Sequence, residues 1–271
     1  GWDSESAVKN IENIVKSTGF DLYTHVIDWE EFRDLQCAFF KASVVDIEML
    51  SDHAISAVVY QLAKKYKIKY ILSGENFVTE AIMPSSWVHR KSDWRNIKAI
   101  HKEFGKGKIK TFPVCSTVTK LWNLFLNMRE VVPLLNYVDY NKTQAMSTLE
   151  EAFGWRYYGG KHFESVFTRF YQGYILPGKF HIDKRKAHLS SLICSSQITR
   201  AEAIIELTKE IYPKPLQYED KMLVCKKLRM TEQEFDIYMK MPARSHYEFS
   251  SDEAFLQGLF KVNKIIKKCF V

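Results

Sequence analysis

The fold class is indicated most clearly by residues 52–76, DHAISAVVYQLAKKYKIKYILSGEN. The first part of this stretch has apolar residues at helical spacing and predicts a helix from about Asp52 to Lys65. We expect four of its side chains to face the core: Ile55, Val58, Val59 and Leu62. The short run Tyr70–Leu72 then predicts a buried strand that ends in the polar tetrapeptide Ser73–Asn76. A helix followed directly by a buried strand is typical of a parallel sheet flanked by helices.

The residues before this stretch alternate in the same way. Ala7, Ile11, Ile14 and Val15 recur at helical spacing, and Gly19 stands where a helix would end. The next two predicted elements are a strand over Leu22–Ile27 and a helix over Trp29–Lys41. The first half of the chain therefore predicts an α/β fold, a parallel sheet with helices on both faces.

Strand signals fade after residue 115, and the remainder of the chain is predicted to be mainly helical. Its helical signals are an apolar period over Leu121–Val132, a helix over Thr143–Phe153 stopped at Gly154, capping boxes at Thr199/Glu202 and Thr231/Glu234, and a basic C-terminal segment, Lys261–Lys268. We predict a nucleotide-binding α/β domain over residues 1–115 and a mainly helical region that binds substrate or anions over residues 116–271.

Composition and charge narrow the possible functions. Hydrophobic residues make up 46% of the 271 residues and charged residues 26%, which favours a folded chain with a substantial core over disorder. The net charge of +7 favours an anionic partner such as a nucleotide, a nucleic acid or a phosphorylated sugar. The five scattered cysteines show no zinc-site spacing and fit a reducing, cytoplasmic location. We expect no membrane span, since no apolar run approaches the ~18 to 20 residues that a span needs.

A basic segment, Gly159–Arg200 (GGKHFESVFTRFYQGYILPGKFHIDKRKAHLSSLICSSQITR), contains only two acids, Glu164 and Asp183. Charge runs are usually solvated faces, but the scarcity of acids favours a surface that binds phosphate. If the first part is helical, Lys161, Ser165 and Thr168 share one stripe. We expect four cations to converge on one cleft with three orienting groups around them: Lys161, Arg169, Lys184 and Arg185, with His162, Asp183 and His188.

Two further groups are candidates for nucleotide binding. Ser73, Gly74, Glu75 and Asn76 follow a strand, where glycine would let the backbone approach a ligand, although an ordinary strand-to-helix turn has the same pattern. Asp46 and Asp52 could hold Mg²⁺ beside phosphates, or Asp52 could simply cap a helix.

Two chemically distinctive side chains have ordinary interpretations. Cys194 and Trp155 are interpreted as core residues, not as a nucleophile and a stacking platform.

Three stretches resemble the N-acetyl sugar amidotransferases of bacterial surface-polysaccharide synthesis: LSGENFVTE, ASVVDIEMLSDHAI and the block Gly159–Arg200. That family belongs to the PP-loop ATP pyrophosphatases, and the resemblance implies their Rossmann-like adenine-nucleotide α-hydrolase fold. It extends over nearly the whole chain, with Ser196 standing where glycine is expected. The family's Ser-Gly-Gly-x-Asp-Ser loop and N-terminal cysteine pairs do not occur in these 271 residues. The resemblance therefore starts after the family's second strand, and we expect these residues alone not to hydrolyse ATP.

The resemblance implies an ATP- and Mg²⁺-dependent reaction in lipopolysaccharide or O-antigen synthesis. The N-acetyl group of a nucleotide-linked sugar would be adenylated on its amide oxygen, and ammonia would then displace AMP to leave an acetamidino group. The implied partners are a glutaminase subunit and a cyclase-like, ammonia-channelling subunit resembling those of imidazole glycerol phosphate synthase. Arg185→Ala is expected to impair this reaction without disturbing the fold. The alternatives are a PP-loop tRNA-modifying enzyme, although we expect no nucleic-acid partner, and a non-catalytic nucleotide-binding or scaffold subunit.

Overall fold

The computed structural model describes residues 1–119, 121, 129–256 and 258. These form two compact units, each built from three separate segments of the chain. Unit 1 contains Gly1–Val26, Tyr70–Trp87 and Val131–Met241, and unit 2 contains the described residues of Ile27–Lys69, Val88–Glu130 and Pro242–Val271. Because both units are discontinuous in sequence, neither coincides with a boundary at residue 115, and the functional division made there stays a prediction.

Unit 2 is built on three helices, α2 (Trp29–Ala42), α3 (Met49–Lys65) and α5 (Trp94–Phe104). Asp28 and Asp93 cap α2 and α5 by accepting hydrogen bonds from the third backbone N–H of each helix. Helices α2 and α5 pack together and bury Phe39 and Ile97. A short 3₁₀ turn, η4 (His246–Glu248), also belongs to this unit.

Helix α3 confirms the predicted helix but buries a different face. Ile55 is 63% exposed, whereas Leu50, His53, Ala54 and Ala57 are buried at i, i+3, i+4 and i+7 spacing. The inward-facing set predicted from the sequence was wrong at Ile55 and Val59 because small alanines and a histidine, not the largest aliphatic side chains, form the packed stripe.

Unit 1 begins with α1 (Glu5–Thr18), which packs against α7 (Lys142–Phe153). Both helices end where the sequence predicts, because Gly19 and Gly154 adopt the left-handed conformation, with φ of 68° and 60°. The Asn10 side chain joins the two regions by donating to the Arg156 carbonyl at 2.8 Å and accepting from the Arg156 N–H at 2.9 Å.

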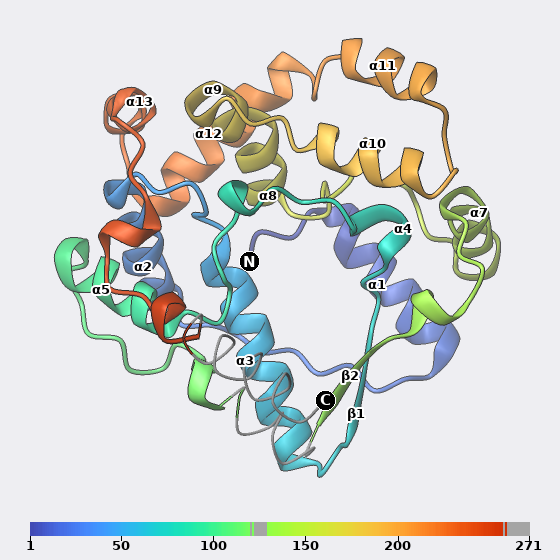
Figure 1. The fold of residues 1–271 in the computed structure, drawn as a ribbon, viewed down its shortest axis with the longest axis horizontal. Coiled ribbons are helices and arrows are strands. Elements are labelled where there is room, and N and C mark those ends of the chain that lie inside the picture. Colours follow the sequence, from blue (N-terminus) through green and yellow to red (C-terminus); the bar gives the residue numbers. More distant parts are fainter. Residues whose placement is uncertain (120, 122–128, 257, 259–271) are drawn as a thin grey trace. The chain divides into compact units, whose positions relative to one another are not determined.

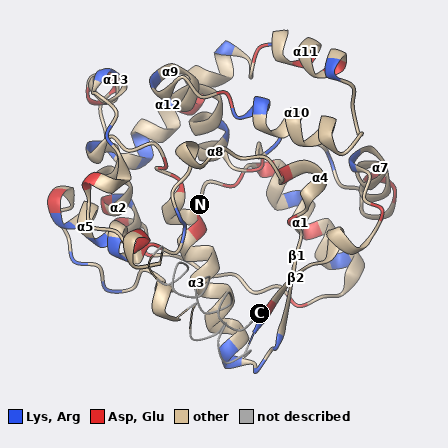
Figure 2. Ribbon diagram, viewed as in Figure 1, with Lys and Arg blue, Asp and Glu red and all other residues tan. Residues whose placement is uncertain are grey.

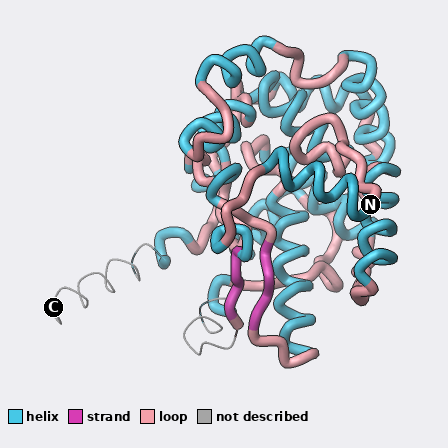
Figure 3. Tube along the Cα trace, turned by 90° about the vertical axis from the view of Figure 1, so that its right-hand side faces the viewer, coloured by secondary structure: helices cyan, strands magenta, loops and turns pink. Residues whose placement is uncertain are grey.

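The sheet is much smaller than predicted. Within the described residues, β1 (Tyr70–Ser73) pairs with β2 (Glu130–Pro133) in a two-stranded parallel sheet, which is followed by the 3₁₀ turn η2 (Leu134–Tyr137) (Figure 3). The predicted strand over Leu22–Ile27 was wrong, because this run finds no pairing partner and Val26 is 85% exposed. The described residues therefore make a mainly helical structure with a small parallel sheet.

The later segments of unit 1 confirm the prediction of a mainly helical second half (Figure 1). The elements are α4 (Phe77–Glu80), η1 (Ser85–Trp87), α8 (Val166–Phe170), the π-helical turn η3 (Tyr171–Ile175), α9 (Leu176–Phe180), α10 (Arg185–Cys194), α11 (Arg200–Thr208), α12 (Lys214–Leu228) and α13 (Glu232–Lys240). Both predicted capping boxes form, at the starts of α11 and α13. The predicted helix over residues 121–132 lies mostly outside the described residues, and its last positions belong to β2. The basic segment 261–268 lies outside them entirely.

The core of unit 1 forms along the continuous run of α8, η3 and α9. Phe167, Phe170 and Ile175 are buried, and the Phe170 ring stacks on Tyr174 with centroids 5.0 Å apart. Helices α12 and α13 pack against α8 and α9. In the part of the chain that is described, no helix has both the length and the apolar character required to cross a bilayer.

Candidate functional site

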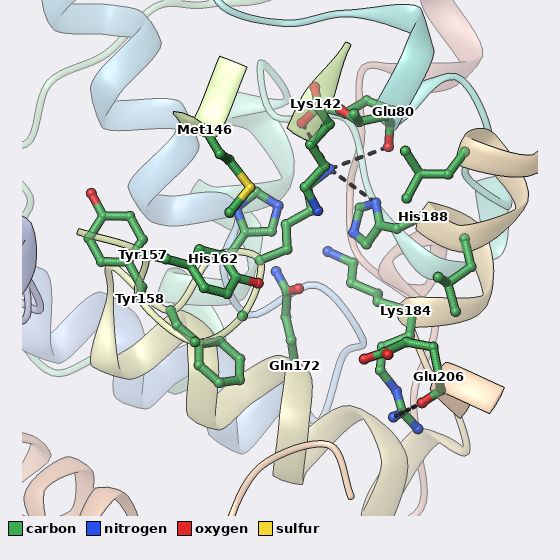
Figure 4. Close-up of a pocket in the computed structure, with 18 of the residues that line it drawn as sticks. Glu80, Lys142, Met146, Tyr157, Tyr158, His162, Gln172, Lys184, His188 and Glu206 are labelled. Atoms are coloured by element: carbon green, nitrogen blue, oxygen red, sulfur yellow. Dashed lines mark hydrogen bonds and ion pairs between the residues drawn. The ribbon is translucent and has the colours of Figure 1, made fainter. Parts of the chain in front are cut away.

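Unit 1 contains a cavity of about 950 Å³ (Figure 4). Its walls come from the turn after β1, the end of α4, the start of α7, the loop 155–164, η3 and the first turns of α10. Eight of the residues predicted for a site line this cavity: Gly74, Asn76, Lys161, His162, Asp183, Lys184, Arg185 and His188. The structure thus brings together residues of the turn Ser73–Asn76 and of the basic segment Gly159–Arg200.

The loop before α8 replaces the helix that would have aligned Lys161 with Ser165 and Thr168. Gly159 and His162 have positive φ angles of 90° and 65°, so the chain turns here instead of continuing as a helix. Helix α8 starts only at Val166, and Ser165 caps it by accepting from the Thr168 N–H at 3.2 Å. The expected polar stripe was therefore wrong, and the turn directs Lys161 toward α4 and α10.

Lys161 lies at the centre of a polar contact set. Its ammonium group reaches the Glu80 carboxylate at 3.1 Å, the Thr79 carbonyl at 3.4 Å and Nδ1 of His188 at 3.1 Å. Three acceptors match the three N–H donors of an ammonium group. Burial lowers the pKa of Lys161, with Glu80 opposing this shift and the charges of Lys142 and Lys184 adding to it.

His188 completes this contact set as a neutral imidazole. Burial, together with the positive charge of Lys161, lowers the pKa of His188 to about 3. In a neutral ring, Nδ1 can accept a hydrogen bond from the Lys161 ammonium group, and the ring proton is then on Nε2. His188 therefore holds the position of Lys161 at neutral pH without adding to the positive charge of the cavity.

Two further lysines point into the same space. Figure 4 shows Lys142 and Lys184 directed toward the centre of the cavity, with Gln172 beside them. Lys142 is the first residue of α7, Lys184 is the N-cap of α10, and Gln172 belongs to η3. The sequence prediction included Lys184 but missed Lys142 and Gln172, because they belong to segments with no concentration of charge. Only the folded chain brings them beside residues 161 and 188.

The two arginines of the predicted cluster are engaged elsewhere. Arg169 forms a two-pronged ion pair with the buried Asp220, with nitrogen–oxygen distances of 2.8 and 2.7 Å, and it does not belong to the lining of the cavity. Arg185 pairs with Asp183 at 2.7 Å and donates to the Lys209 carbonyl at 2.8 Å just past the end of α11. The expected convergence of all four cations was therefore wrong for Arg169, and Arg185 is held at the edge of the cavity by internal partners.

The scarcity of acids in the basic segment does not persist in three dimensions. Glu80 from α4 and Asp220 from α12 pair with Lys161 and Arg169, and both acids lie far from these lysine and arginine residues in the sequence. Figure 2 shows acidic as well as basic residues along the helices of unit 1. The charge of the segment alone overstated the number of cations available to a ligand.

An aromatic wall lies opposite part of this polar surface. Trp155, Tyr157 and Tyr158 line the cavity together with Met146 of α7 (Figure 4). Trp155 was predicted to be a core residue and instead contributes to the cavity wall, while Cys194, also predicted to be buried, is exposed. Aromatic rings provide flat apolar surfaces with polar edges, which suit a ligand that has both apolar and hydroxylated faces.

The turn after β1 meets the cavity through Gly74 and Asn76 but not through Ser73 or Glu75. Asn76 caps α4 by accepting from the Thr79 N–H at 2.9 Å. A Cβ atom added at Gly74 would meet nothing within 4 Å, so this glycine is not required by protein packing. The turn therefore positions α4 and Glu80, and a close approach of a ligand to Gly74 stays a prediction.

Asp46 and Asp52 lie in unit 2, where both pair with Lys91, at 2.8 and 3.0 Å. Burial opposes ionisation of Asp46, but Lys91 and the His89 N–H keep the pKa of this carboxyl below its usual value. Asp52 lies within the first turn of α3, so it does not act as the N-cap of that helix. In the described residues, no group of three or more His, Cys, Asp or Glu side chains is placed to hold a metal ion. Both aspartates thus share Lys91 as an ion-pair partner, and Mg²⁺ binding by them stays a prediction.

Comparison with known proteins supports a role in polysaccharide synthesis. Residues 164–265 match the family described as LPS biosynthesis protein WbpG-like, C-terminal domain. A comparison with curated proteins gave no match. The matched residues include α8 to α13 and four of the predicted site residues that line the cavity: Asp183, Lys184, Arg185 and His188. Over this region the chain is similar to proteins of lipopolysaccharide biosynthesis.

Proposed function

We propose that this chain is the sugar-binding part of an ATP-dependent amidotransferase of lipopolysaccharide or O-antigen synthesis. Its substrate would be a nucleotide-linked sugar whose N-acetyl group becomes an acetamidino group. The observation that carries the proposal is the cavity of unit 1, which places lysines opposite an aromatic wall in a region that partly coincides with the WbpG-like match. Sugar rings pack on aromatic faces, and phosphates bind to lysines.

The chemistry requires activation because an amide oxygen is a poor leaving group. Transfer of AMP from ATP to that oxygen releases pyrophosphate and makes the amide carbon electrophilic. Ammonia then attacks this carbon, the attacking nitrogen loses a proton, and AMP departs with the oxygen. Positive groups held in advance near the developing negative charge would lower the barrier of these steps.

The cavity residues contribute binding and orientation in this scheme. Lys161 is fixed by Glu80 and His188, so it provides a positive charge that needs no rearrangement when the substrate binds. The aromatic wall would orient the sugar, and a separate glutaminase subunit with a cyclase-like partner would deliver ammonia. The proposal gives no residue of this chain a role in ATP or Mg²⁺ binding, because the Ser-Gly-Gly-x-Asp-Ser loop does not occur in it and Asp46 and Asp52 both pair with Lys91.

The test is sugar-dependent AMP formation by the full-length protein. The assay supplies ATP, Mg²⁺, a nucleotide-linked acetamido sugar and ammonium chloride, so that loss of a glutaminase contact does not affect the result. Mass spectrometry of the product should show the sugar about 1 Da lighter, since NH replaces O.

Trp155→Ala should reduce kcat/KM for the sugar roughly tenfold, because an aromatic contact with a ligand contributes about 0.5–1.5 kcal/mol beyond its buried area. Tyr137→Ala is the matched control, since Tyr137 is an exposed aromatic residue of unit 1 outside the cavity lining. AMP formation that depends on tRNA instead of sugar would favour the tRNA-modifying alternative. AMP formation that depends on neither would refute the proposal.

A further inference from the structure

The most informative feature of the cavity is the meeting of three lysines from three separate segments. Lys142 comes from the start of α7, Lys161 from the loop before α8, and Lys184 from the start of α10. All three line the cavity, and the charges of Lys142 and Lys184 add to the lowering of the Lys161 pKa that burial causes and Glu80 opposes. Like charges repel, so this arrangement costs free energy when the cavity holds no anion.

Only one carboxylate of the described cavity wall pairs directly with any of the three lysines. Glu80 pairs with Lys161, and within the described residues no carboxylate forms an ion pair with Lys142 or Lys184. The other acids of the cavity wall have partners of their own or face solvent: Glu164 with His162, Asp183 with Arg185, Glu202 with Thr199, Glu206 with Lys209, and the exposed Glu210. Among the described residues, therefore, Lys142 and Lys184 line the cavity without an ion-pair partner, and the neutral His188 adds no further positive charge.

We propose that Lys142, Lys161 and Lys184 form a binding site for a diphosphate group, with Gln172 as an additional hydrogen-bond donor. Lys142 and Lys184 have no ion-pair partner among the described residues, so both can contact the two phosphates of a nucleotide-linked sugar. A lysine is a compact point charge with three donors and can contact either phosphate as it arrives. A cavity of about 950 Å³ lies within the range that holds a ligand of this size.

The aromatic wall would determine the orientation of a bound nucleotide-linked sugar. Trp155, Tyr157 and Tyr158 precede Lys161 in one continuous loop, so the sugar bound to the diphosphate would lie on their faces while the phosphates contact the lysines. This inference rests on the proposed function for the identity of the sugar. The site for the diphosphate rests on the three lysines alone.

Isothermal titration calorimetry on the 271-residue chain tests the site directly. The probes are UDP-N-acetylglucosamine, UDP, inorganic pyrophosphate and free N-acetylglucosamine. Lys142→Gln and Lys184→Gln should each weaken the binding of UDP and of UDP-N-acetylglucosamine about ten- to a hundredfold, as expected when a charge-assisted contact is lost. Lys186→Gln is the matched control, because Lys186 lies two residues beyond Lys184 but is exposed and outside the cavity lining. Circular dichroism checks that each variant is folded.

The four probes distinguish the possible sources of the diphosphate. Tighter binding of UDP-N-acetylglucosamine than of pyrophosphate, with the difference lost in Trp155→Ala, supports the nucleotide-linked sugar. Equal binding of the two, unaffected by Trp155→Ala, overturns the placement of the sugar. Wild-type affinity for every phosphate probe in Lys142→Gln and Lys184→Gln overturns the site itself.

The proposed function can fail separately. UDP-N-acetylglucosamine binding that depends on Lys142, in a full-length protein that forms no acetamidino sugar, would refute the reaction and leave the binding site standing. Amidination that proceeds normally in Lys142→Gln would refute the diphosphate site and leave the proposed reaction standing.

Discussion

The lysine cavity of unit 1 and the buried polar cluster of unit 2 use similar residues in opposite ways. In unit 2, Asp46 accepts from Lys91 at 2.8 Å and from the His89 N–H at 2.8 Å, while Asp93 accepts from Nε2 of His89 at 2.9 Å. Every charge there has a protein partner close by. In unit 1, Lys142 and Lys184 point instead into open space. The comparison shows that a concentration of charged residues indicates a ligand only where the protein leaves part of the charge unbalanced.

The strongest test of this contrast is removal of the central carboxylate of unit 2. Asp46→Ala would leave the partly exposed Lys91 with only Asp52 and the buried His89 N–H without its acceptor, and it should lower the free energy of unfolding by about 2–3 kcal/mol. Urea denaturation measures the effect. Asp52→Ala is the control and should cost less than about 1 kcal/mol, because Asp52 is about half exposed. Equal losses of stability in the two variants would show that the burial of Asp46 does not make its ion pair with Lys91 more important than that of Asp52.

Arg185 and its neighbour Lys184 provide the same contrast within unit 1. Arg185→Ala should lower the free energy of unfolding by about 2 kcal/mol, because it leaves Asp183 and the carbonyl groups at the end of α11 without their donor. Lys184→Gln should change stability by less than about 0.5 kcal/mol while weakening the binding of phosphates. The sequence led us to expect that Arg185→Ala would leave the fold undisturbed, whereas the contacts of Arg185 predict a loss of stability. Thermal unfolding of both variants measures stability, and calorimetry measures phosphate binding. Unaltered stability in Arg185→Ala would contradict a structural role for Arg185.

The pH dependence of the free energy of unfolding provides a third test, with a smaller and gradual expected change. Burial, together with the neighbouring His89 ring 4.4 Å away, lowers the pKa of His246 to about 3. Because the unfolded chain binds this proton near pH 6.5 and the folded chain does not, stability should fall as the pH decreases from about 6.5 toward 3. The contribution is at most about 1.4 kcal/mol per pH unit.

Urea denaturation between pH 6.5 and 5 isolates this contribution from the carboxylates, which titrate lower. His246→Asn should flatten the slope, although His188 in unit 1 will preserve part of it, since its pKa is also lowered to about 3. His25→Asn, at an exposed position, should leave the slope unaltered. A slope that persists in full in His246→Asn would mean that His246 is protonated in the folded protein.

The sequence predicted local structure well where neighbouring residues determine it. Gly19 and Gly154 end helices as expected, and the capping boxes at Thr199 and Thr231 form, because these features depend on hydrogen bonds within four residues. The strand over residues 22–27 failed because a strand requires a distant partner that the sequence pattern does not identify.

The need for distant partners also explains which residues of the candidate site the sequence predicted and which it missed. Lys161, Lys184 and His188 were found because they share one unusual segment, and they do line one cavity. Lys142 and Glu80 were missed because each is an ordinary charged residue at a helix end, and their importance comes only from contacts across the fold. Arg169 was misplaced for the same reason, since its partner Asp220 lies 51 residues away.

The π-helical turn η3 has a consequence for how the site could have arisen. A π turn fits one more residue into a helix than the α-helical hydrogen-bond pattern allows, so it corresponds to a single-residue insertion. Removing one residue from Tyr171–Ile175 would restore a regular helix and rotate the residues on one side of the deletion by about 100° relative to the other. Gln172 would then leave the cavity, or Gly173 would lose the position that lets the Tyr212 ring approach its backbone. One extra residue therefore lets the same helix satisfy both the aromatic core and the ligand cavity, and relatives that lack it should differ in the ligand they hold.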